Sequence, residues 1–389
     1  MPITKIAAGA IGLALCLHAA YAQTPSPAPV LSARAWLLLD AASGDVLGSR
    51  EPDTRIEPAS LTKLMTAYVV FEALQDRTIT LDRKVTVSKR AWQVAPGSSK
   101  MFLEPGTQVS IEELLYGLLV QSGNDAAIAL AEAVAGSVEA FVARMNEQAG
   151  ELGLVSTHFS NPHGLPDPGT YSTARDLSVL AVRLVRDFPG LAGKYDATKQ
   201  YTYNRITQPN RNRLLWLDPS VDGMKTGHTT SAGYSLIATA RRPDHHGPRR
   251  LISVVVGTAS DRARTEESRT LLEWGFRNFE TVRVYKGNEA VAIEPVWKGA
   301  RSTVPVGFTR DIYVSVPAGA RVERVLRPAT PLVAPLAVNA PAGEVQVRVN
   351  GQAVRRMPLV TLQPVSPASW AGRTWDGLRL WLRAVAGMH

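Results

Sequence analysis

The sequence predicts a mixed α/β (α+β) domain, a small all-β domain and a C-terminal amphipathic helix. Within residues 35–285, two strand patterns precede a helical middle, and further strands and a helix follow it. This order favours one antiparallel sheet with helices packed on it and a helical lobe beside it. In residues 286–366 short alternating stretches replace helical periodicity. Residues 367–389 place apolar side chains on one broad helical arc.

Composition is that of a globular chain long enough for two domains. The 389 residues are 45% hydrophobic and 20% charged, and the formal net charge is +9. A positive charge favours anionic surroundings such as phospholipid headgroups. The basic residues are dispersed, however, and no Lys/Arg run with interleaved aromatic residues occurs, so we expect no nucleic-acid partner.

Residues 1–22 have the pattern of an export signal peptide. A lysine lies near the start, residues 6–17 are apolar, and Ala20-Tyr21-Ala22 gives the small-x-small cleavage pattern. The only cysteine, Cys16, lies inside this segment, so the mature chain would carry no thiol. Lipid attachment at Cys16 is an alternative, but Leu15 stands where a small residue is expected. The signal predicts an extracytoplasmic protein.

The mature chain begins with a Pro-rich linker, residues 23–34, which favours an extended conformation. Residues 35–48 then have a strand, turn and strand pattern. Later helical patterns cover residues 111–119, 126–134, 138–152, 173–188 and 266–277, and late strand patterns cover residues 233–240 and 250–257. In the all-β region, Asn350-Gly351 follows an alternating stretch and predicts a hairpin turn, because both residues tolerate positive φ.

A serine and a lysine three residues apart form the central motif. Ser60 and Lys63 lie at the predicted opening turn of a helix, so their side chains share one face. A serine hydroxyl is a weak nucleophile that needs a base, and a lysine can act as one when its surroundings lower its pKa. Such a pair alone is weak evidence, because a capping serine and a solvated lysine have the same spacing.

Two further tripeptides make the pattern specific. Ser122-Gly123-Asn124 lies between two helical segments, where a loop can project a hydroxyl and an amide into a cleft. Lys225-Thr226-Gly227 precedes a predicted strand, and its glycine allows close approach of the backbone. Either tripeptide alone would be an ordinary loop or turn. Their order after the serine and lysine of the helix indicates one catalytic constellation.

With these motifs the chain resembles the penicillin-recognising serine acyl-transferases, and more narrowly the type-five D-alanyl-D-alanine carboxypeptidases. The resemblance rests on Ser60-Leu61-Thr62-Lys63, Ser122-Gly123-Asn124-Asp125-Ala126, His163-Gly164-Leu165, Asn210-Arg211-Asn212, Asp222-Gly223-Met224-Lys225-Thr226-Gly227-His228-Thr229 and residues 267–276. It extends from about Ala35 to the C-terminus. It implies that residues 35–285 form a serine β-lactamase/transpeptidase-like catalytic domain.

The resemblance also implies the reaction. Ser60 would attack the carbonyl between the two D-alanines of a peptidoglycan stem pentapeptide, and water would then hydrolyse the acyl-enzyme. Lys63 would accept the proton of Ser60, Ser122 would relay a proton to the leaving amine, and Asn124 would bind the substrate's peptide carbonyl. No metal and no cofactor is implied. β-Lactam antibiotics would be covalent inhibitors.

The substrate ends in a carboxylate, which calls for cations and hydroxyl donors. The resemblance implies Lys225, Thr226, Thr229 and either Arg264 or Arg211. Backbone N–H groups of Ser60 and His228 would form the oxyanion hole. Gly227, in the same motif as His228, is implied as a further substrate-binding residue. His163 has a counterpart in the family, although a structural role in a loop fits it equally well.

The tail suits a membrane surface. On a helical wheel, Trp375, Trp381 and other apolar residues share a broad arc, and a narrow polar arc contains Arg379. Such a segment is too short and too charged to span a bilayer but suits its interface. The resemblance implies a periplasmic enzyme attached peripherally to the outer face of the inner membrane. The alternative is a helix docked on its own β domain.

Three other readings of the motifs stay open. A class A β-lactamase would carry a Glu-x-x-Leu-Asn motif, and no Leu-Asn dipeptide occurs in this sequence. A transpeptidase or endopeptidase of the same superfamily is possible, because the motifs do not fix the acyl acceptor. A non-catalytic cell-wall binding module is a reading of a different class, and the intact Ser60 and Lys63 argue against it.

Overall fold

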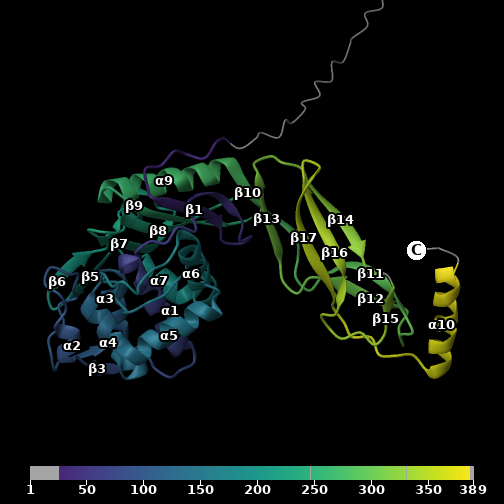
Figure 1. Cartoon of the computed structure of the whole chain (residues 1–389), viewed down its shortest axis with the longest axis horizontal. Coiled ribbons are helices and arrows are strands. Elements are labelled where there is room, and N and C mark those ends of the chain that lie inside the picture. Colours follow the sequence, from purple (N-terminus) through teal and green to yellow (C-terminus); the bar gives the residue numbers. More distant parts are fainter. Residues whose placement is uncertain (1–25, 246, 330, 386–389) are drawn as a thin grey trace, which may run out of the picture.

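A computed structural model describes residues 26–245, 247–329 and 331–385. These residues form a mixed unit of sheet and helices, a second unit of strands, and a terminal helix at the far end of the molecule (Figure 1). The predicted fold class is therefore confirmed. The predicted signal peptide, residues 1–22, lies outside the described residues.

The mixed unit is built on a five-stranded antiparallel sheet in the order β2-β1-β9-β8-β7. Its strands are β1 (Ala35–Asp40), β2 (Val46–Arg50), β7 (Val221–Thr229), β8 (Gly233–Arg242) and β9 (Arg249–Thr258). Two small antiparallel pairs lie outside it, β3 (Lys84–Thr86) with β4 (Gln108–Ser110) and the hairpin of β5 (Gln200–Tyr203) with β6 (Ile206–Pro209). Strand β1 pairs with the late strand β9, so the sheet joins the two ends of this unit.

Helices cover both faces of the sheet (Figure 1). Helix α9 (Asp261–Asn278) packs on one face, and the short α8 (Leu214–Leu217) adds Leu214 and Leu215 to the same core. The other helices lie on the opposite face: α1 (Lys63–Gln75), α2 (Lys89–Trp92), α3 (Ile111–Leu119), α4 (Asn124–Ala135), α5 (Val138–Glu151), α6 (Ala174–Asp187) and α7 (Pro189–Asp196). All six residues of β1 are buried because its side chains enter both layers: Leu37 joins the larger core, and Leu38 joins the core under α9.

The predicted helices of the middle segment are confirmed to within a few residues. Helix α3 has the predicted bounds, because Ser110 and Glu113 form a capping box at its start. Helix α9 begins five residues before the predicted start, at Asp261, where the Ser260 side chain caps it by accepting the N–H of Ala263. The charged first turns of α9 carry no apolar periodicity, which is why the sequence pattern begins later.

The second unit consists of strands alone. Its sheet runs in the order β14-β16-β17-β12-β11-β15, with a separate pair β10-β13. The strands are β10 (Phe279–Tyr285), β11 (Ala290–Trp297), β12 (Thr303–Gly307), β13 (Ile312–Pro317), β14 (Val322–Pro328), β15 (Leu332–Val333), β16 (Pro341–Val349) and β17 (Gln352–Thr361). The hairpin predicted at Asn350-Gly351 joins β16 to β17, and both residues have positive φ. Buried valines from five of these strands, β10, β11, β12, β13 and β16, form much of the core.

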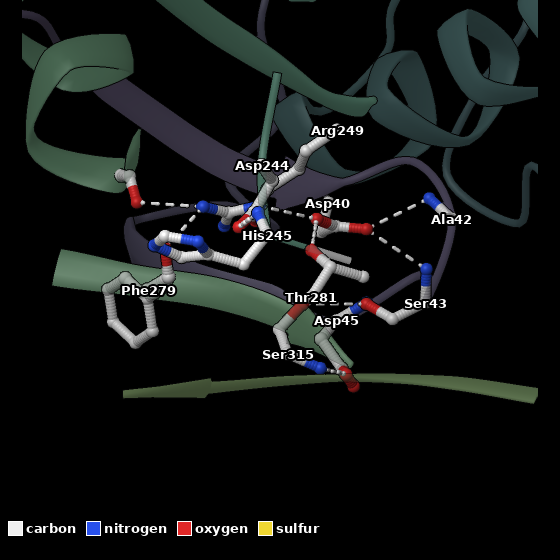
Figure 2. A network of polar contacts seen from close by, with 11 residues as sticks. Asp40, Ala42, Ser43, Asp45, Asp244, His245, Arg249, Phe279, Thr281 and Ser315 are labelled. Atoms are coloured by element: carbon white, nitrogen blue, oxygen red, sulfur yellow. Dashed lines mark hydrogen bonds and ion pairs between the residues drawn. The ribbon is translucent and has the colours of Figure 1, made fainter. Parts of the chain in front are cut away.

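A polar network links the two units (Figure 2). Asp40 at the end of β1 is fully buried; it accepts from Arg249 Nε at 3.0 Å and from the hydroxyl of Thr281 in β10. Asp45, in the turn that follows β1, accepts from the guanidinium of Arg355 in β17 and from the N–H of Ser315. Asp40 and Asp45, at the two ends of the turn between β1 and β2, thus connect the mixed unit to strands of the second unit. These contacts fix the orientation of the second unit relative to the first.

Helix α10 (Trp370–Val385) lies at the end of the second unit remote from the mixed unit (Figure 1). Its polar side contacts that unit: the Asp376 carboxylate accepts the N–H of Lys298 at 2.8 Å, and the Arg379 guanidinium lies 5.5 Å from the ring centroid of Trp297. Trp375 and Trp381 on its apolar side are 63% and 61% exposed. The helix is therefore docked by its polar arc and leaves its apolar arc free.

Within the described ranges, no single helix has the length and apolar character needed to cross a membrane. The bent pair α4 and α5, at 85° to each other, passes the same test of length and composition. Their apolar residues, including Leu130, Phe141 and Met145, belong to the larger core of the mixed unit.

Removing the Asp40 carboxylate should strongly destabilise the protein. In Asp40→Ala, Arg249, which is 2% exposed, would keep a buried charge without its partner, at a cost of about 3–5 kcal/mol. The free energy of unfolding in urea measures this loss. The control is Arg269→Ala, which breaks the exposed Arg269–Glu273 pair and should cost about 0.5 kcal/mol or less. A loss below about 1 kcal/mol in Asp40→Ala would contradict the role given to the network.

Candidate active site

The predicted nucleophile lies on a tight turn that leads into helix α1. Ser60 belongs to a 3₁₀ turn, Ala59–Thr62, and not to the α-helix itself. Ala59 before it has φ +49°, and the carbonyl of Ala59 faces Gly164, where a Cβ atom would lie 1.8 Å from that oxygen. Gly227 of β7 approaches the same turn, because its Cβ would lie 3.0 Å from the carbonyl oxygen of Pro58. Two glycines therefore allow the loop at 164 and β7 to close on the nucleophile.

Lys63 is fully buried next to Ser60, as the shared face predicted. Its Nζ lies 3.1 Å from Ser60 Oγ, 2.7 Å from Asn124 Oδ1 and 2.6 Å from the carbonyl oxygen of His163. Burial, with a smaller contribution from the positive charge of Arg211, lowers the pKa of Lys63 to about 7. The protonated amine donates its three N–H groups to Ser60 Oγ, Asn124 Oδ1 and the carbonyl of His163. In the neutral form Asn124 and His163 can accept both remaining N–H groups, which leaves the lone pair to receive the proton of Ser60.

The second motif lies in the loop between α3 and α4, as predicted. Ser122 has φ +62°, and its hydroxyl is buried without a hydrogen-bond partner among the described residues. A buried hydroxyl without a hydrogen-bond partner reduces the stability of the fold. Because Ser122 lies at the cleft, its hydroxyl is available to form a hydrogen bond with a substrate. Asn124 is the first residue of α4, and its side-chain oxygen is bound to Lys63. Its amide nitrogen remains to donate to a ligand.

Asp125, beside Asn124, has a structural role that the sequence did not reveal. Its buried carboxylate accepts the backbone N–H of Met101 at 2.8 Å and that of Leu103 at 3.1 Å. The preceding residue, Asn124, donates its own N–H to the carbonyl of Ser99 at 2.9 Å. The start of α4 therefore holds the segment 99–103 against the cleft. An aspartate in the first helical turn is usually assigned to the helix dipole, which hides this role.

The third motif lies on β7, at the edge of the sheet next to the nucleophile. Lys225 is 2% exposed, and its Nζ donates to the carbonyl of Thr226 at 3.0 Å. Burial holds the pKa of Lys225 well below its usual range, and the charges of Lys63 and Arg211 act in the same direction. Thr226 and Gly227 line the cleft.

The two residues after this motif differ in orientation. The ring of His228 lines the cleft and stacks on Tyr234, with 3.9 Å between the ring centroids. The hydroxyl of Thr229 instead donates to Glu57 Oε1 at 2.8 Å and accepts the N–H of Ala232. Thr229 thus ties the end of β7 to the segment before Ser60.

Arg211 and Arg264 both lie at the cleft but differ in their hydrogen-bond and ion-pair partners. Arg264 is 4% exposed; its guanidinium pairs with Asp261 and donates to the carbonyl of Gly227 at 3.2 Å. Arg211 forms no hydrogen bond or ion pair with the described residues, and burial lowers its pKa. The flanking Asn210 and Asn212 bind backbone carbonyls, at 3.1 Å to Thr198 and 2.9 Å to Gly223, which holds Arg211 in place.

His163 contributes its backbone to the site. Its carbonyl accepts from Lys63, and its imidazole nitrogen accepts the N–H of Leu165 at 3.1 Å. Burial lowers the pKa of this imidazole to about 3, with a further contribution from the charge of Lys63, so the ring is neutral. A carbonyl has no residue-type signature, so the sequence pattern could not point to this contact.

These groups surround a cleft of about 330 Å³. Its wall is formed by Ser60, Ser99, Ser122, Arg211, Arg213, Thr226, Gly227, His228, Tyr234, Asp261 and Arg264. The buried Lys63, Asn124 and Lys225 lie just beneath this wall. A larger hollow of about 1150 Å³ beside α9 contains no nucleophile next to a base. Among the described residues, no cluster of three His, Cys, Asp or Glu side chains could hold a metal.

Ser60 lies next to the buried amine of Lys63, whose pKa is lowered, and Arg211 at the cleft has no hydrogen-bond or ion-pair partner among the described residues. This arrangement is that of a serine acyl-transfer site for substrates with an anionic group. The comparisons with known proteins agree. Residues 21–260 match the family model described as D-alanyl-D-alanine carboxypeptidase, and residues 279–366 match the C-terminal domain of penicillin-binding protein 5. The chain belongs to the D-alanyl-D-alanine carboxypeptidase family.

Three relatives show how far the similarity extends. The D-alanyl-D-alanine carboxypeptidase DacC of Escherichia coli is 44% identical, over 95% of this chain and 94% of its own. Penicillin-binding protein 5 of Haemophilus influenzae has a TM-score of 0.84 at 40% identity, over 88% of this chain and all of its own. Penicillin-binding protein D2 of Listeria monocytogenes, solved in a cefotaxime-bound form, has a TM-score of 0.59 at 31% identity, over 64% of this chain and all of its own.

The rate of acylation by benzylpenicillin should rise with pH through about 7 and level off above it. The proton acceptor must be neutral, and the pKa of Lys63 is about 7, so the reactive form is the minor one below that pH. His163 stays neutral over the same range and adds no inflection. Rapid-mixing measurements from about pH 5 to pH 9 test this.

The same profile tests the cause of the shift. In Arg211→Met the inflection should move to higher pH, because the charge of Arg211 is one of the causes that lower the pKa of Lys63. A wild-type rate that is flat or falls with increasing pH across this range would contradict the assignment of Lys63 as the base.

Proposed function

We propose that this protein is a serine-type D-Ala-D-Ala carboxypeptidase that removes the terminal D-alanine from peptidoglycan stem pentapeptides. The observation that carries the proposal is the fully buried Lys63, held as a neutral base 3.1 Å from Ser60 in a chain of this family. Burying an amine without a carboxylate partner costs free energy of folding. A non-catalytic cell-wall binding module would gain nothing from such a residue, whereas a serine hydrolase uses it as the base.

The proposed reaction has two steps. Ser60 Oγ bonds to the carbonyl carbon between the two D-alanines, and its proton passes to Lys63 Nζ. The C–N bond then breaks, the leaving amine takes a proton by way of Ser122, and D-alanine departs. Water next attacks the ester carbonyl and gives a proton to Lys63 Nζ. The bond between the acyl carbon and Ser60 Oγ then breaks, Lys63 returns the proton to Ser60 Oγ, and the shortened peptide leaves with its new carboxylate. Backbone N–H groups of Ser60 and His228 stabilise the oxyanion in both steps.

The terminal carboxylate of the substrate is best assigned to Arg211, with Thr226 and Lys225 beside it. Arg264 is already paired with Asp261, whereas Arg211 has a free guanidinium at the cleft. A planar guanidinium matches a carboxylate in a bidentate geometry. The role of Arg264 is then to hold the carbonyl of Gly227 and keep β7 in place. The hydroxyl of Thr229 is bound to Glu57. Thr229 therefore supports the site by holding the end of β7 against the segment before Ser60.

β-Lactams bind at the same serine. Their carboxylate and strained amide resemble the D-Ala-D-Ala end of the substrate, and the Listeria relative was solved with cefotaxime. The acyl-enzyme should persist, because the class A Glu-x-x-Leu-Asn motif for deacylation is missing from the sequence.

We further propose that the enzyme works in the periplasm and attaches peripherally to the inner membrane through α10. The helix is docked by Asp376 and Arg379, and Trp370, Trp375 and Trp381 remain more than half exposed. Tryptophans suit the headgroup region of a bilayer. The alternative, a helix that buries its apolar face on the β unit, does not account for this orientation. The signal-like pattern of residues 1–22 supports export.

Ser60→Ala should abolish both activities of the wild-type protein. Wild type should release D-alanine from a pentapeptide ending in D-Ala-D-Ala, and benzylpenicillin should add its mass to the protein. Without Oγ neither acyl-enzyme can form, and Lys63→Ala should lose acylation almost as completely, because base and nucleophile act as one unit. Intact-protein mass spectrometry detects the adduct, and product masses identify the reaction.

The control is Arg356→Ala, an exposed side chain on β17. A penicillin adduct that persists in Ser60→Ala would place the nucleophile elsewhere. Peptide products joined to a second stem, in place of free D-alanine, would make the enzyme a transpeptidase.

Ending the chain after Ser366 should release an enzyme that hydrolyses small substrates at the wild-type rate but no longer binds vesicles. The residues that line the cleft belong to the mixed unit, whereas α10 lies at the far end of the second unit (Figure 1). The deletion therefore removes the exposed tryptophans and leaves the active site intact. Co-sedimentation with vesicles containing anionic phospholipid compares the two forms. If both bind equally, α10 is not the anchor.

A further inference from the structure

An ion pair at the wall of the catalytic cleft connects the starts of two helices. Arg213 comes directly before α8, and Asp261 is the first residue of α9. Arg213 Nη1 lies 3.6 Å from Asp261 Oδ2, and both residues line the cleft. Neither residue has a part in the reaction described above.

Asp261 is the fixed member of this pair. Its Oδ1 pairs with the guanidinium of Arg264, whose side chain is only 5% exposed. Thr265 Oγ1 donates to the backbone carbonyl of Asp261 at 2.9 Å, and the side chain of Ser260 caps the first turn of α9. Asp261 is therefore held in place whether or not Arg213 is bound to it.

Arg213 is the movable member of the pair. Its side chain is 59% exposed, and it forms no other ion pair or side-chain hydrogen bond with the described residues. A long exposed side chain loses rotamer entropy when it is held, so an ion pair of this kind adds little to stability. The Arg213 side chain can therefore leave Asp261 at small cost and without disturbing the fold.

The pair lies beside the groups that we assign to the leaving group. Arg211, proposed above to bind the terminal carboxylate, is two residues before Arg213 in the chain. Arg264, which holds Asp261, also donates to the carbonyl of Gly227 in the motif of β7 at 3.2 Å. The pair therefore belongs to the end of the cleft that receives the departing residue.

The cleft has room for a short leaving group. Its volume of about 330 Å³ is at the lower end of the range for ligand sites. D-Alanine carries only a methyl group on the carbon that bears its amine and its carboxylate. A leaving group that continues into a second stem peptide carries a long chain on that carbon, and this chain needs additional space next to the carboxylate.

We propose that Arg213, held at the cleft by Asp261, is the specificity-determining residue that limits the leaving group to a single small amino acid. The inference rests on the proposed carboxypeptidase function and deepens it, because the three motifs do not decide whether the departing amine belongs to a free residue or to a second stem. When the ion pair is closed, only a short side chain fits beside the terminal carboxylate. When the Arg213 side chain is removed, longer leaving groups enter the same site and the same acyl-enzyme forms from them.

The closed state depends on charge as well as on size. The side chains of Arg213 and Asp261 are 59% and 39% exposed, so dissolved ions screen their attraction. The pair of Asp261 with the buried Arg264 is screened much less. High salt should therefore release Arg213 and leave Asp261 in place.

The experiment compares three substrates with one acyl part, Nα,Nε-diacetyl-L-Lys-D-Ala, followed by D-alanine, D-leucine or Nε-acetyl-D-lysine. Wild-type kcat/KM, measured from the release of the last residue, should fall by about a hundredfold from the first substrate to the third. In Arg213→Ala this ratio should shrink to about tenfold or less, mainly through faster cleavage of the third substrate. Sodium chloride at about 1 M should shrink the ratio in wild type but have no such effect in Arg213→Ala.

Two variants are the matched controls. Arg213→Lys keeps a positive charge opposite Asp261 and should retain most of the wild-type ratio at low salt. Arg262→Ala breaks an exposed ion pair with Glu266 on the same helix and should leave the ratio unchanged, because Arg262 does not line the cleft. Circular dichroism verifies the fold of each variant. A merely structural role for Arg213 would lower kcat/KM for all three substrates together and would not change their ratio.

Equal kcat/KM for the three substrates in wild type would overturn the inference while leaving the carboxypeptidase intact. A ratio that stays at about a hundredfold in a folded Arg213→Ala protein would also overturn it, because the limit would then lie elsewhere in the cleft. A uniform loss for all three substrates in that variant would have the same consequence. Failure of wild type to release D-alanine from the first substrate would overturn the proposed function and, with it, the inference.

Discussion

The structure of the active site depends on the burial of one amine, Lys63, that has no ion-pair partner among the residues that the structure describes. Burying an ammonium without such a partner is costly, and this burial is the main reason why the pKa of Lys63 is lowered to about 7. Asp125 is the carboxylate that opposes this shift, but its oxygens accept the N–H groups of Met101 and Leu103. The arrangement keeps a base next to Ser60 without a buried acid in contact with it.

Local patterns in the sequence were sufficient for much of the fold. Helix α3 was predicted to the residue from its helical pattern, and the capping box of Ser110 and Glu113 in the structure fixes its start. The hairpin at Asn350-Gly351 was predicted because positive φ selects those residues. Ser60 and Lys63 were expected on a helix and lie at its start, with the serine on a 3₁₀ turn. Patterns within a few residues specify such elements.

The contacts that complete the site join residues far apart in the chain. Lys63 binds Asn124 and the carbonyl of His163, which are 61 and 100 residues away. Thr229 was assigned to the substrate carboxylate from its motif, yet its hydroxyl binds Glu57, 172 residues away. The two candidate arginines were equivalent in sequence, and only the pairing of Arg264 with Asp261 separates them. Such partners depend on tertiary packing, which leaves no periodicity to detect.

Helix α10 lies at the end of the second unit remote from the mixed unit (Figure 1), and its tryptophans are exposed. In the attachment proposed above, the enzyme would search a surface and not a volume, and its cleft would stay within one molecular length of that surface. Stems in strands beyond this shell would keep their last D-alanine. The ratio of stems without the terminal D-alanine to stems that retain it would then vary with depth in the wall. This ratio would indicate which strands had been close to the membrane.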